Sequence, residues 1–128
     1  MAANIQVNKE SVLAFYDLAF NQRKPEEAVA KYVGGQYRQH NPQAGDGPEP
    51  FIGFVKWFAG EFPKMKVTFK RTIAEGDLVA VHCHFTRKPG DRGQAVIDFF
   101  RLESGKIVEH WDVVQEIPET AANTNTMF

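Results

Sequence analysis

The sequence has one cysteine, Cys83, and no cluster of basic residues. A single cysteine excludes an intramolecular disulfide and any metal site built from several cysteines. Cys83 lies in an alternating apolar run, which favours a small buried hydrophobe over a reactive thiol. Lys and Arg are scattered and the formal net charge is −1, so no surface is predicted to neutralise phosphates. We therefore expect no nucleic-acid partner.

Long apolar runs are also absent. No stretch approaches the ~20 residues of a membrane-spanning helix, and no N-terminal segment has the length and flanks of a signal peptide. We therefore expect no membrane association and a cytoplasmic location. No glycine-rich phosphate loop or nucleophile elbow is present, so the sequence gives no indication of a nucleotide-binding protein or a serine hydrolase.

What is present fits one domain spanning residues 1–128. A chain of this length buries roughly two-thirds of its unfolded surface, so it needs no disulfide or metal to fold. Eleven phenylalanines are more than usual, and aromatic side chains line pockets for flat apolar ligands as well as cores. The phenylalanine count therefore raises the expectation of a pocket.

Three helices are predicted in the first half of the chain. A helix to about residue 20, capped by Asn8 or Ser11, places apolar residues at the spacing of one face. A short helix begins at Pro25 and ends before residue 34. Residues 37–42 lead into a loop rich in Gly, Asp and Pro. The third helix runs from about residue 49 to 60.

From residue 65 the spacing of apolar residues changes from the helical repeat to alternation, with every second residue apolar. Strands are predicted at about 65–73, 78–87, 94–103 and 106–117, with turns at 75–77, 89–93 and 104–105. Helices followed by sequential hairpins indicate an α+β fold, in which a curved antiparallel sheet wraps around the N-terminal helices. Such a sheet leaves a cone-shaped cavity open at one end.

Alternation along the last two strands brings ionisable side chains together. His110 and Asp112 share one face of their strand, and the tight turn at residues 104–105 makes Asp98 a near cross-strand neighbour of Asp112. A carboxylate close to another carboxylate and to aromatic rings has a raised proton affinity, as a general acid/base near neutral pH requires. Asp112, Asp98 and His110 are therefore the candidate catalytic residues. The alternative is a solvated sheet face on which both aspartates pair with Lys or Arg.

Other aromatic and histidine side chains are candidates for contact with a ligand. His82 and His84 share one face of their strand, but no third ligand stands at a recognisable spacing, so no metal site is predicted. His40 precedes an Asn-Pro turn and is as well explained by a local hydrogen bond. The helical Phe residues are more typical of a core than of a ligand site. The candidate substrate-binding residues are Tyr37, His40, His82, His84, Phe15, Phe54, Phe58, Phe100 and Trp111.

Several segments together resemble a known family. They are YRQHNP at 37–42, HCH at 82–84, DFFR at 98–101, GKIVEHWDV at 105–113 and the closing NTNTMF at 123–128. In this order, the chain resembles the SnoaL-like polyketide cyclases of the nuclear transport factor 2-like superfamily over nearly its whole length.

The resemblance implies a cone with a deep hydrophobic pocket, a homodimer associating through the sheet, and no cofactor or metal. It also implies an intramolecular aldol condensation of a hydrophobic carbonyl compound, with Asp112 as the acid/base. Asp98 stands where characterised cyclases carry a histidine, so a His–Asp pair is replaced here by an Asp–Asp pair.

Three functions remain open from the sequence. The first is a cofactor-independent enzyme, a cyclase or isomerase that transfers a proton beside a carbonyl group. The second is a domain that binds a small apolar molecule without transforming it. The third is an assembly module whose sheet face serves only to dimerise. A salt bridge from Asp112 to Arg101 or Arg38 would favour the two non-catalytic functions.

Overall fold

The computed structural model describes residues 4–128. Its helices lie in the first half of the chain. They are α1 (Ile5–Tyr16), a π-helical continuation η1 (Asp17–Asn21), α2 (Pro25–Tyr32) and α3 (Pro48–Glu61). The cap of α1 is Asn4, whose side chain accepts the Val7 N–H, so the predicted cap at Asn8 or Ser11 is wrong. Asn8 instead lies inside the helix and is buried. Proline occupies the first turn of both α2 and α3, where its missing N–H leaves no hydrogen bond unmade.

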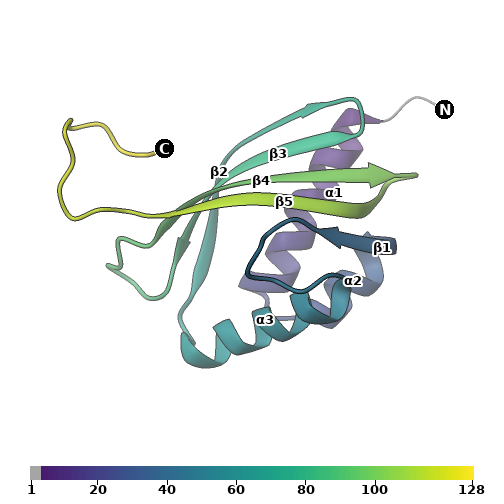
Figure 1. Cartoon of the computed structure of the whole chain (residues 1–128), viewed down its shortest axis with the longest axis horizontal. Coiled ribbons are helices and arrows are strands. Elements are labelled where there is room, and N and C mark those ends of the chain that lie inside the picture. Colours follow the sequence, from purple (N-terminus) through teal and green to yellow (C-terminus); the bar gives the residue numbers. More distant parts are fainter. Residues whose placement is uncertain (1–3) are drawn as a thin grey trace.

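Five strands form one sheet in the order β1-β5-β4-β3-β2 (Figure 1). Four of them are the predicted hairpin strands, β2 (Lys66–Glu75), β3 (Leu78–Thr86), β4 (Gln94–Glu103) and β5 (Lys106–Glu116). Each of these pairs antiparallel with its neighbour in sequence. Helices cover one side of this curved sheet, so the fold is the predicted α+β cone.

The strand β1 (Val33–Gln39) was not predicted. It pairs parallel to β5, so the sheet is mixed and not antiparallel as predicted. The local sequence gives no signal for this strand, because two glycines interrupt the alternation of apolar residues. Its hydrogen-bonding partner β5 lies about seventy residues further along the chain. Gly34 fits here because a Cβ at this position would lie 3.0 Å from the Val108 side chain.

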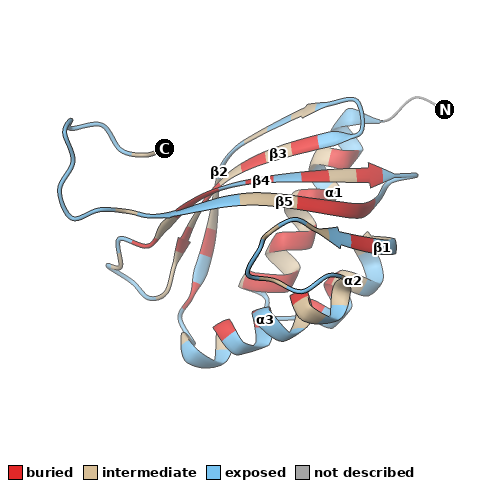
Figure 2. Cartoon of the chain, viewed as in Figure 1, coloured by how far each residue is buried: buried red, intermediate tan, exposed pale blue. Residues whose placement is uncertain are grey.

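The core lies between the helices and the concave face of the sheet. Val12, Phe15 and Val55 from the helices are fully buried, and Val79 and Cys83 of β3 meet them from the sheet. Figure 2 shows the buried positions gathered where the strands face the helices. The predicted burial of Cys83 is confirmed.

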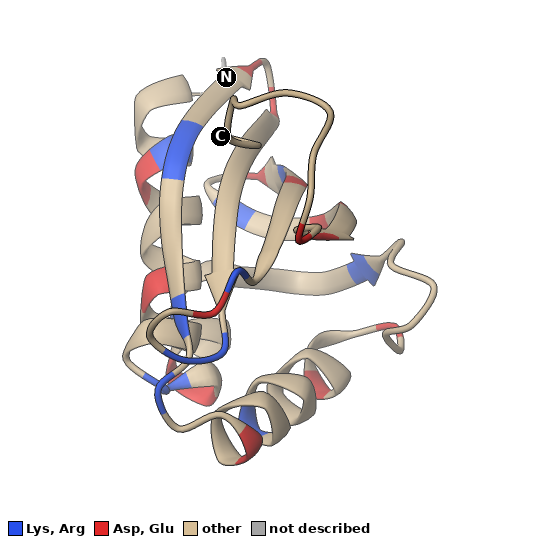
Figure 3. Ribbon diagram, turned by 90° about the vertical axis from the view of Figure 1, so that its left-hand side faces the viewer, with Lys and Arg blue, Asp and Glu red and all other residues tan. Residues whose placement is uncertain are grey.

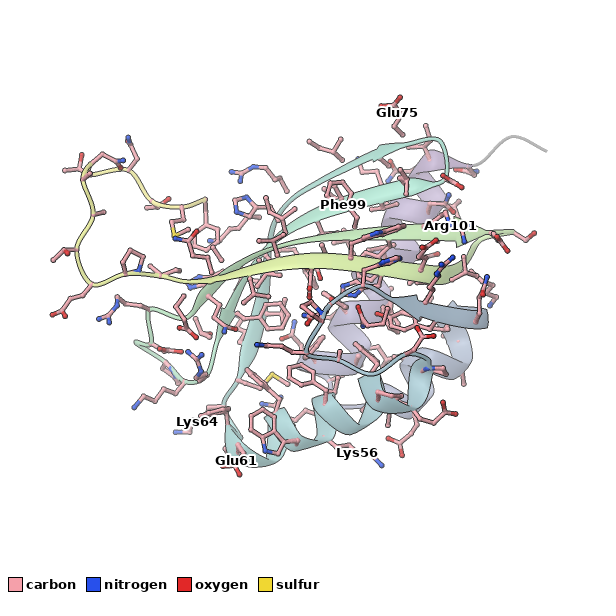
Figure 4. The ribbon with its side chains drawn as sticks, viewed as in Figure 1. Lys56, Glu61, Lys64, Glu75, Phe99 and Arg101 are labelled. Carbon is pink, nitrogen blue, oxygen red and sulfur yellow. The ribbon has the colours of Figure 1, made fainter. Side chains whose placement is uncertain are left out.

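The convex face of the sheet carries exposed apolar side chains. Ile73, Ile97, Phe99 and Val113 are each between 45% and 76% exposed. Phe99 and Arg101 alternate with inward residues along β4, and Figure 4 labels both. Acidic and basic residues are interspersed over the ribbon (Figure 3). Within residues 4–128, no helix is long and apolar enough to cross a membrane.

Candidate functional site

A cavity of about 340 Å³ lies between the helices and the concave side of the sheet. Its wall is largely aromatic because α1, η1 and α3 direct rings toward β3. The rings from the helices include Tyr16, Phe20, Phe51, Phe54 and Phe58, and Phe85 lines the cavity from β3. A second set of lining residues is polar and comes from β1, the loop after it, β4 and β5: Gln39, Asn41, Asp98, His110 and Asp112. The lining also includes the polar side chains of Gln43, Arg87 and Gln94. The cavity therefore joins a large apolar wall to several hydrogen-bonding side chains.

The polar group is built on the β4–β5 hairpin. Asp98 and Asp112 are direct partners in the antiparallel register, which confirms their predicted proximity. His110 Nε2 lies 2.8 Å from Asp98 Oδ1 and 3.8 Å from Asp112 Oδ2. The strand pairing alone therefore brings one imidazole between two carboxylates.

Asp98 is the most enclosed member of the group, with a side chain that is 0% exposed. Its Oδ1 accepts a hydrogen bond from the Tyr16 hydroxyl at 2.6 Å, in addition to the contact with His110. Its Oδ2 lies 3.8 Å from the Cys83 thiol, a weak donor. Three side chains thus take the place of water around a carboxyl group that solvent does not reach.

Asp112 lies at the edge of the cavity and its side chain is 12% exposed. Burial raises the pKa of its carboxyl group above the ordinary value of 3.8, and the charge of Asp98 adds to this rise. His110 and a hydrogen bond from Asn41 Nδ2, at 2.8 Å, oppose it. The net effect is a carboxyl group with increased proton affinity facing an apolar space.

No Lys or Arg within residues 4–128 forms a salt bridge with Asp112. Arg101 instead pairs with Glu103 at 2.7 Å and with Glu109 at 2.8 Å on the other side of the sheet. The solvated alternative, in which both aspartates pair with Lys or Arg, is therefore not what the structure shows.

Tyr16 joins this group although the sequence indicates it only as one apolar residue of a helix. Its hydroxyl lies 3.1 Å from His110 Nε2 as well as 2.6 Å from Asp98. Burial raises the pKa of this hydroxyl well above 10.0, and the nearby Asp98 charge reinforces the shift. Tyr16 therefore remains a neutral donor at physiological pH. The signal in the sequence was a lone hydroxyl within a stripe of apolar residues, which is compatible with any core tyrosine.

The predicted substrate-binding residues are divided between the cavity, the core and the convex face. Phe54 and Phe58 line the cavity. Phe15 and Phe100 are completely buried in the core behind it and do not line it. Tyr37 is also buried, with its ring stacked on His110 at a centroid distance of 5.9 Å.

Seven of the nine predicted substrate-binding residues do not line the cavity, and four of these seven lie on the convex side of the sheet. Trp111 alternates with His110 and Asp112 and therefore points to the convex face, where His40 stacks on it at 4.7 Å. His40 also pairs with Glu109 at 2.7 Å. His82 and His84 occupy the same convex face, because Val81, Cys83 and Phe85 fill the buried positions of β3.

The C-terminal residue covers these two histidines. The ring of Phe128 lies 5.2 Å from that of His82 and 4.6 Å from that of His84, measured between centroids. Their surroundings are thus the end of the chain and not the cavity.

Asp98, His110 and Asp112 form the one group within residues 4–128 whose ligand atoms lie close enough to hold a metal ion, all within 4.8 Å. Each side chain offers one ligand atom. Two of these atoms, Asp98 Oδ1 and His110 Nε2, already contact each other and the Tyr16 hydroxyl. The geometry therefore accommodates proton sharing without any added ion.

A protein-family model matches most of the chain. The model of the SnoaL-like domain matches residues 12–110. That range includes Tyr16, Asp98 and His110, and ends two residues before Asp112. A search of curated proteins finds no match.

Solved structures share the fold at low sequence identity. A proposed SnoaL-like polyketide cyclase from Jannaschia aligns with a TM-score of 0.69 and 21% identity, covering 89% of each chain. A proposed ketosteroid isomerase from Kribbella flavida aligns with a TM-score of 0.73 and 22% identity, over 94% of this chain and 86% of that one. AclR, a proposed hydroxylase from Streptomyces galilaeus, aligns with a TM-score of 0.72 and 17% identity, over 88% of this chain and 91% of that one. Because three different activities are named on one fold, the fold alone does not identify the reaction.

Proposed function

Because the chain belongs to the SnoaL-like domain family, we propose that it is a cofactor-independent enzyme of the aldol cyclase or isomerase type. Its substrate would be a hydrophobic small molecule that carries a carbonyl group. The observation that carries this proposal is the Asp112 carboxyl group, which faces an aromatic cavity without a Lys or Arg partner in the described chain and has a raised pKa. Such a group exchanges protons near neutral pH more readily than an exposed aspartate.

In the proposed reaction Asp112 removes a proton from the carbon next to the carbonyl group. The C–H electron pair moves into the new C–C double bond, and the carbonyl π electrons move onto oxygen to give an enolate. In a cyclase, the enolate carbon attacks a second carbonyl of the same molecule, and the resulting alkoxide takes the proton from Asp112. In an isomerase, Asp112 returns the proton to a different carbon.

Tyr16 and the protonated His110 ring are the proposed donors to the enolate oxygen, each turning its hydrogen from Asp98 Oδ1 to the enolate. Both side chains line the polar side of the cavity, and His110 Nε2 lies 3.8 Å from Asp112 Oδ2. Hydrogen bonds of this kind are stronger in a site from which water is excluded. Asp98 would hold both donors in place, since its Oδ1 contacts each of them.

The contact between Asp98 and His110 also concerns the difference at position 98 between this chain and the characterised cyclases. A histidine is expected at position 98 from the resemblance, and an aspartate stands there. The partner of this aspartate is His110, so a His–carboxylate pair is still present with its two residues exchanged between β4 and β5. This pairing supports an acid/base role for the group.

The proposal is tested by deuterium incorporation into β-tetralone, a flat apolar ketone with activated α-protons, followed by NMR in D₂O. We expect exchange above the buffer rate with the wild-type protein and a loss of about 10²–10⁴-fold in Asp112→Asn. The control is Asp77→Asn, an exposed turn residue whose substitution should leave the rate unchanged. Full exchange by Asp112→Asn would refute the role of Asp112. Saturable binding of β-tetralone without exchange would favour the non-catalytic binding domain instead.

For the partner of the sheet we propose a second copy of this chain. The supporting observation is the row of exposed apolar side chains on the convex face, Ile73, Ile97, Phe99 and Val113. Contiguous exposed apolar surface is typical of association sites. Sedimentation of Val113→Glu should show more monomer than wild type, whereas Val7→Glu on α1 should not. An unchanged distribution in Val113→Glu would refute this interface.

A further inference from the structure

We propose that Gln39 is a positioning residue that keeps a proton on Nδ1 of His110, so that the ring exchanges protons only at Nε2, beside Asp98 and Asp112. Its importance for catalysis rests on the proposed function, whereas its effect on the ring does not. Gln39 was not among the residues that the sequence indicated. It is the last residue of β1 and lies in register with His110 across the parallel β1–β5 pair.

The orientation of the Gln39 amide follows from two contacts of its Oε1 atom. Oε1 lies 3.1 Å from the backbone N–H of Asn41 and 2.8 Å from His110 Nδ1. A backbone N–H only donates, so the atom facing it is the carbonyl oxygen and not the NH₂ group. A carbonyl oxygen only accepts, and therefore His110 Nδ1 must carry a proton to make the second contact.

The protonation of Nδ1 decides what the other ring nitrogen does. When the ring is neutral, Nε2 has a lone pair and accepts a hydrogen bond from Asp98 Oδ1–H, 2.8 Å away. When the ring is protonated, Nε2–H donates to the same oxygen. Either way the exchangeable proton lies on the side of the ring that faces the two carboxylates. Without Gln39, the neutral ring could carry its proton on Nε2 and leave its lone pair on Nδ1, turned away from Asp112.

The same segment orients Asp112 by the same logic. Asn41 Oδ1 accepts the backbone N–H of Gln43 at 2.8 Å, which leaves its Nδ2 to donate to Asp112 at 2.8 Å. The Gln39 N–H is itself held by the Asp46 carboxylate at 2.8 Å. The turn after β1 therefore presents a defined acceptor to the histidine and a defined donor to the aspartate.

The direct test is nitrogen-15 NMR of the His110 ring from about pH 5 to pH 9. The titratable groups that face this ring are Tyr16, Tyr37, Asp98 and Asp112. In wild type, Nδ1 should show the chemical shift of a protonated nitrogen at every pH. In Gln39→Leu, part of the neutral ring should change to the Nε2–H form. Gln36→Leu, an exposed position on the same strand, is the matched control and should behave as wild type.

Gln39→Glu provides a variant that keeps an acceptor in place. It should retain the proton on Nδ1 and move that proton's resonance downfield, because a carboxylate accepts a stronger hydrogen bond than an amide. An unprotonated Nδ1 in wild type would overturn the inference, as would ring shifts that are unchanged in Gln39→Leu. If Gln39→Leu does not fold, an Nδ1 proton resonance that is unmoved in Gln39→Glu would overturn it.

Exchange of β-tetralone separates the inference from the proposed function. We expect kcat to fall by about 10- to 100-fold in Gln39→Leu with little change in KM, and to recover partly in Gln39→Glu. A wild-type protein that shows the expected ring shifts but no exchange would reject the proposed function and leave the role of Gln39 intact. Normal exchange in Gln39→Leu with unchanged ring shifts would reject the role of Gln39 alone.

Discussion

Replacing Tyr16 with Phe removes one oxygen and leaves the ring that packs edge-on against Phe20 and Phe100. That oxygen donates to Asp98 at 2.6 Å, inside a site that solvent does not reach. A hydrogen bond to a charged group contributes about 1.5–3 kcal/mol to the free energy of unfolding, because its loss leaves a buried carboxylate with one donor fewer. We expect Tyr16→Phe to lose about 2 kcal/mol of stability, and roughly 5–10 °C in Tm for a domain of this size.

Tyr37→Phe is the matched control for this prediction. Tyr37 is also buried, but its hydroxyl has no hydrogen-bond partner among the described residues. Removing a buried polar atom that makes no bond is expected to be neutral or stabilising. The two substitutions therefore delete the same atom with opposite consequences.

Urea denaturation followed by tryptophan fluorescence measures both variants. At the slopes typical of small domains, the midpoint of Tyr16→Phe should fall by about 1 M relative to wild type. Equal losses in the two variants would show that the Tyr16 hydroxyl bond to Asp98 contributes nothing specific. A larger loss in Tyr37→Phe would refute the reasoning altogether.

Three further predictions concern stability and reactivity. The folded-state pKa of Asp112 is raised, so ionisation of this carboxyl group destabilises the fold above that pKa. Asp112→Asn should therefore have a higher Tm than wild type at neutral pH, and the difference should shrink as the pH falls to about 4. A difference in Tm that grows in acid would contradict the raised pKa. Gly93→Ala should lower the Tm of the protein far more than Gly90→Ala. Both glycines have a positive φ, but only at Gly93 would a Cβ lie 2.1 Å from the Phe85 carbonyl oxygen. Similar losses of Tm in the two variants would contradict this. Burial raises the pKa of the Cys83 thiol, so iodoacetamide should not label the native protein at pH 8 but should label it fully in urea. Rapid labelling of the native protein would show that the thiol is accessible.

The hairpins and the central acidic pair could be predicted from the sequence because their determinants are local. Alternation defines the faces of β4 and β5, and the two-residue turn sets the register that pairs Asp98 with Asp112. The positions of His110 and Trp111 on opposite faces follow from the same alternation. Alternation also turns His82 and His84 to the face of β3 opposite Cys83, so the prediction that these histidines contact a ligand conflicted with the predicted burial of Cys83.

The remaining site residues depend on contacts between distant segments. Gln39 and Asn41 act through β1, whose pairing with β5 has no signature in a segment with two glycines. Tyr16 reaches Asp98 across 82 positions of sequence, and only the packing of α1 against the sheet brings them together. Side chains that orient the candidate acid/base were therefore harder to predict than the acid/base itself.

The pH dependence of deuterium exchange into β-tetralone tests the central claim most directly. If Asp112 is the base, the exchange rate should fall on acidification with a midpoint above 3.8, the ordinary value for an aspartate, and this pH-dependent step should vanish in Asp112→Asn. An exchange rate that follows the same pH profile in Asp112→Asn as in wild type would contradict the account.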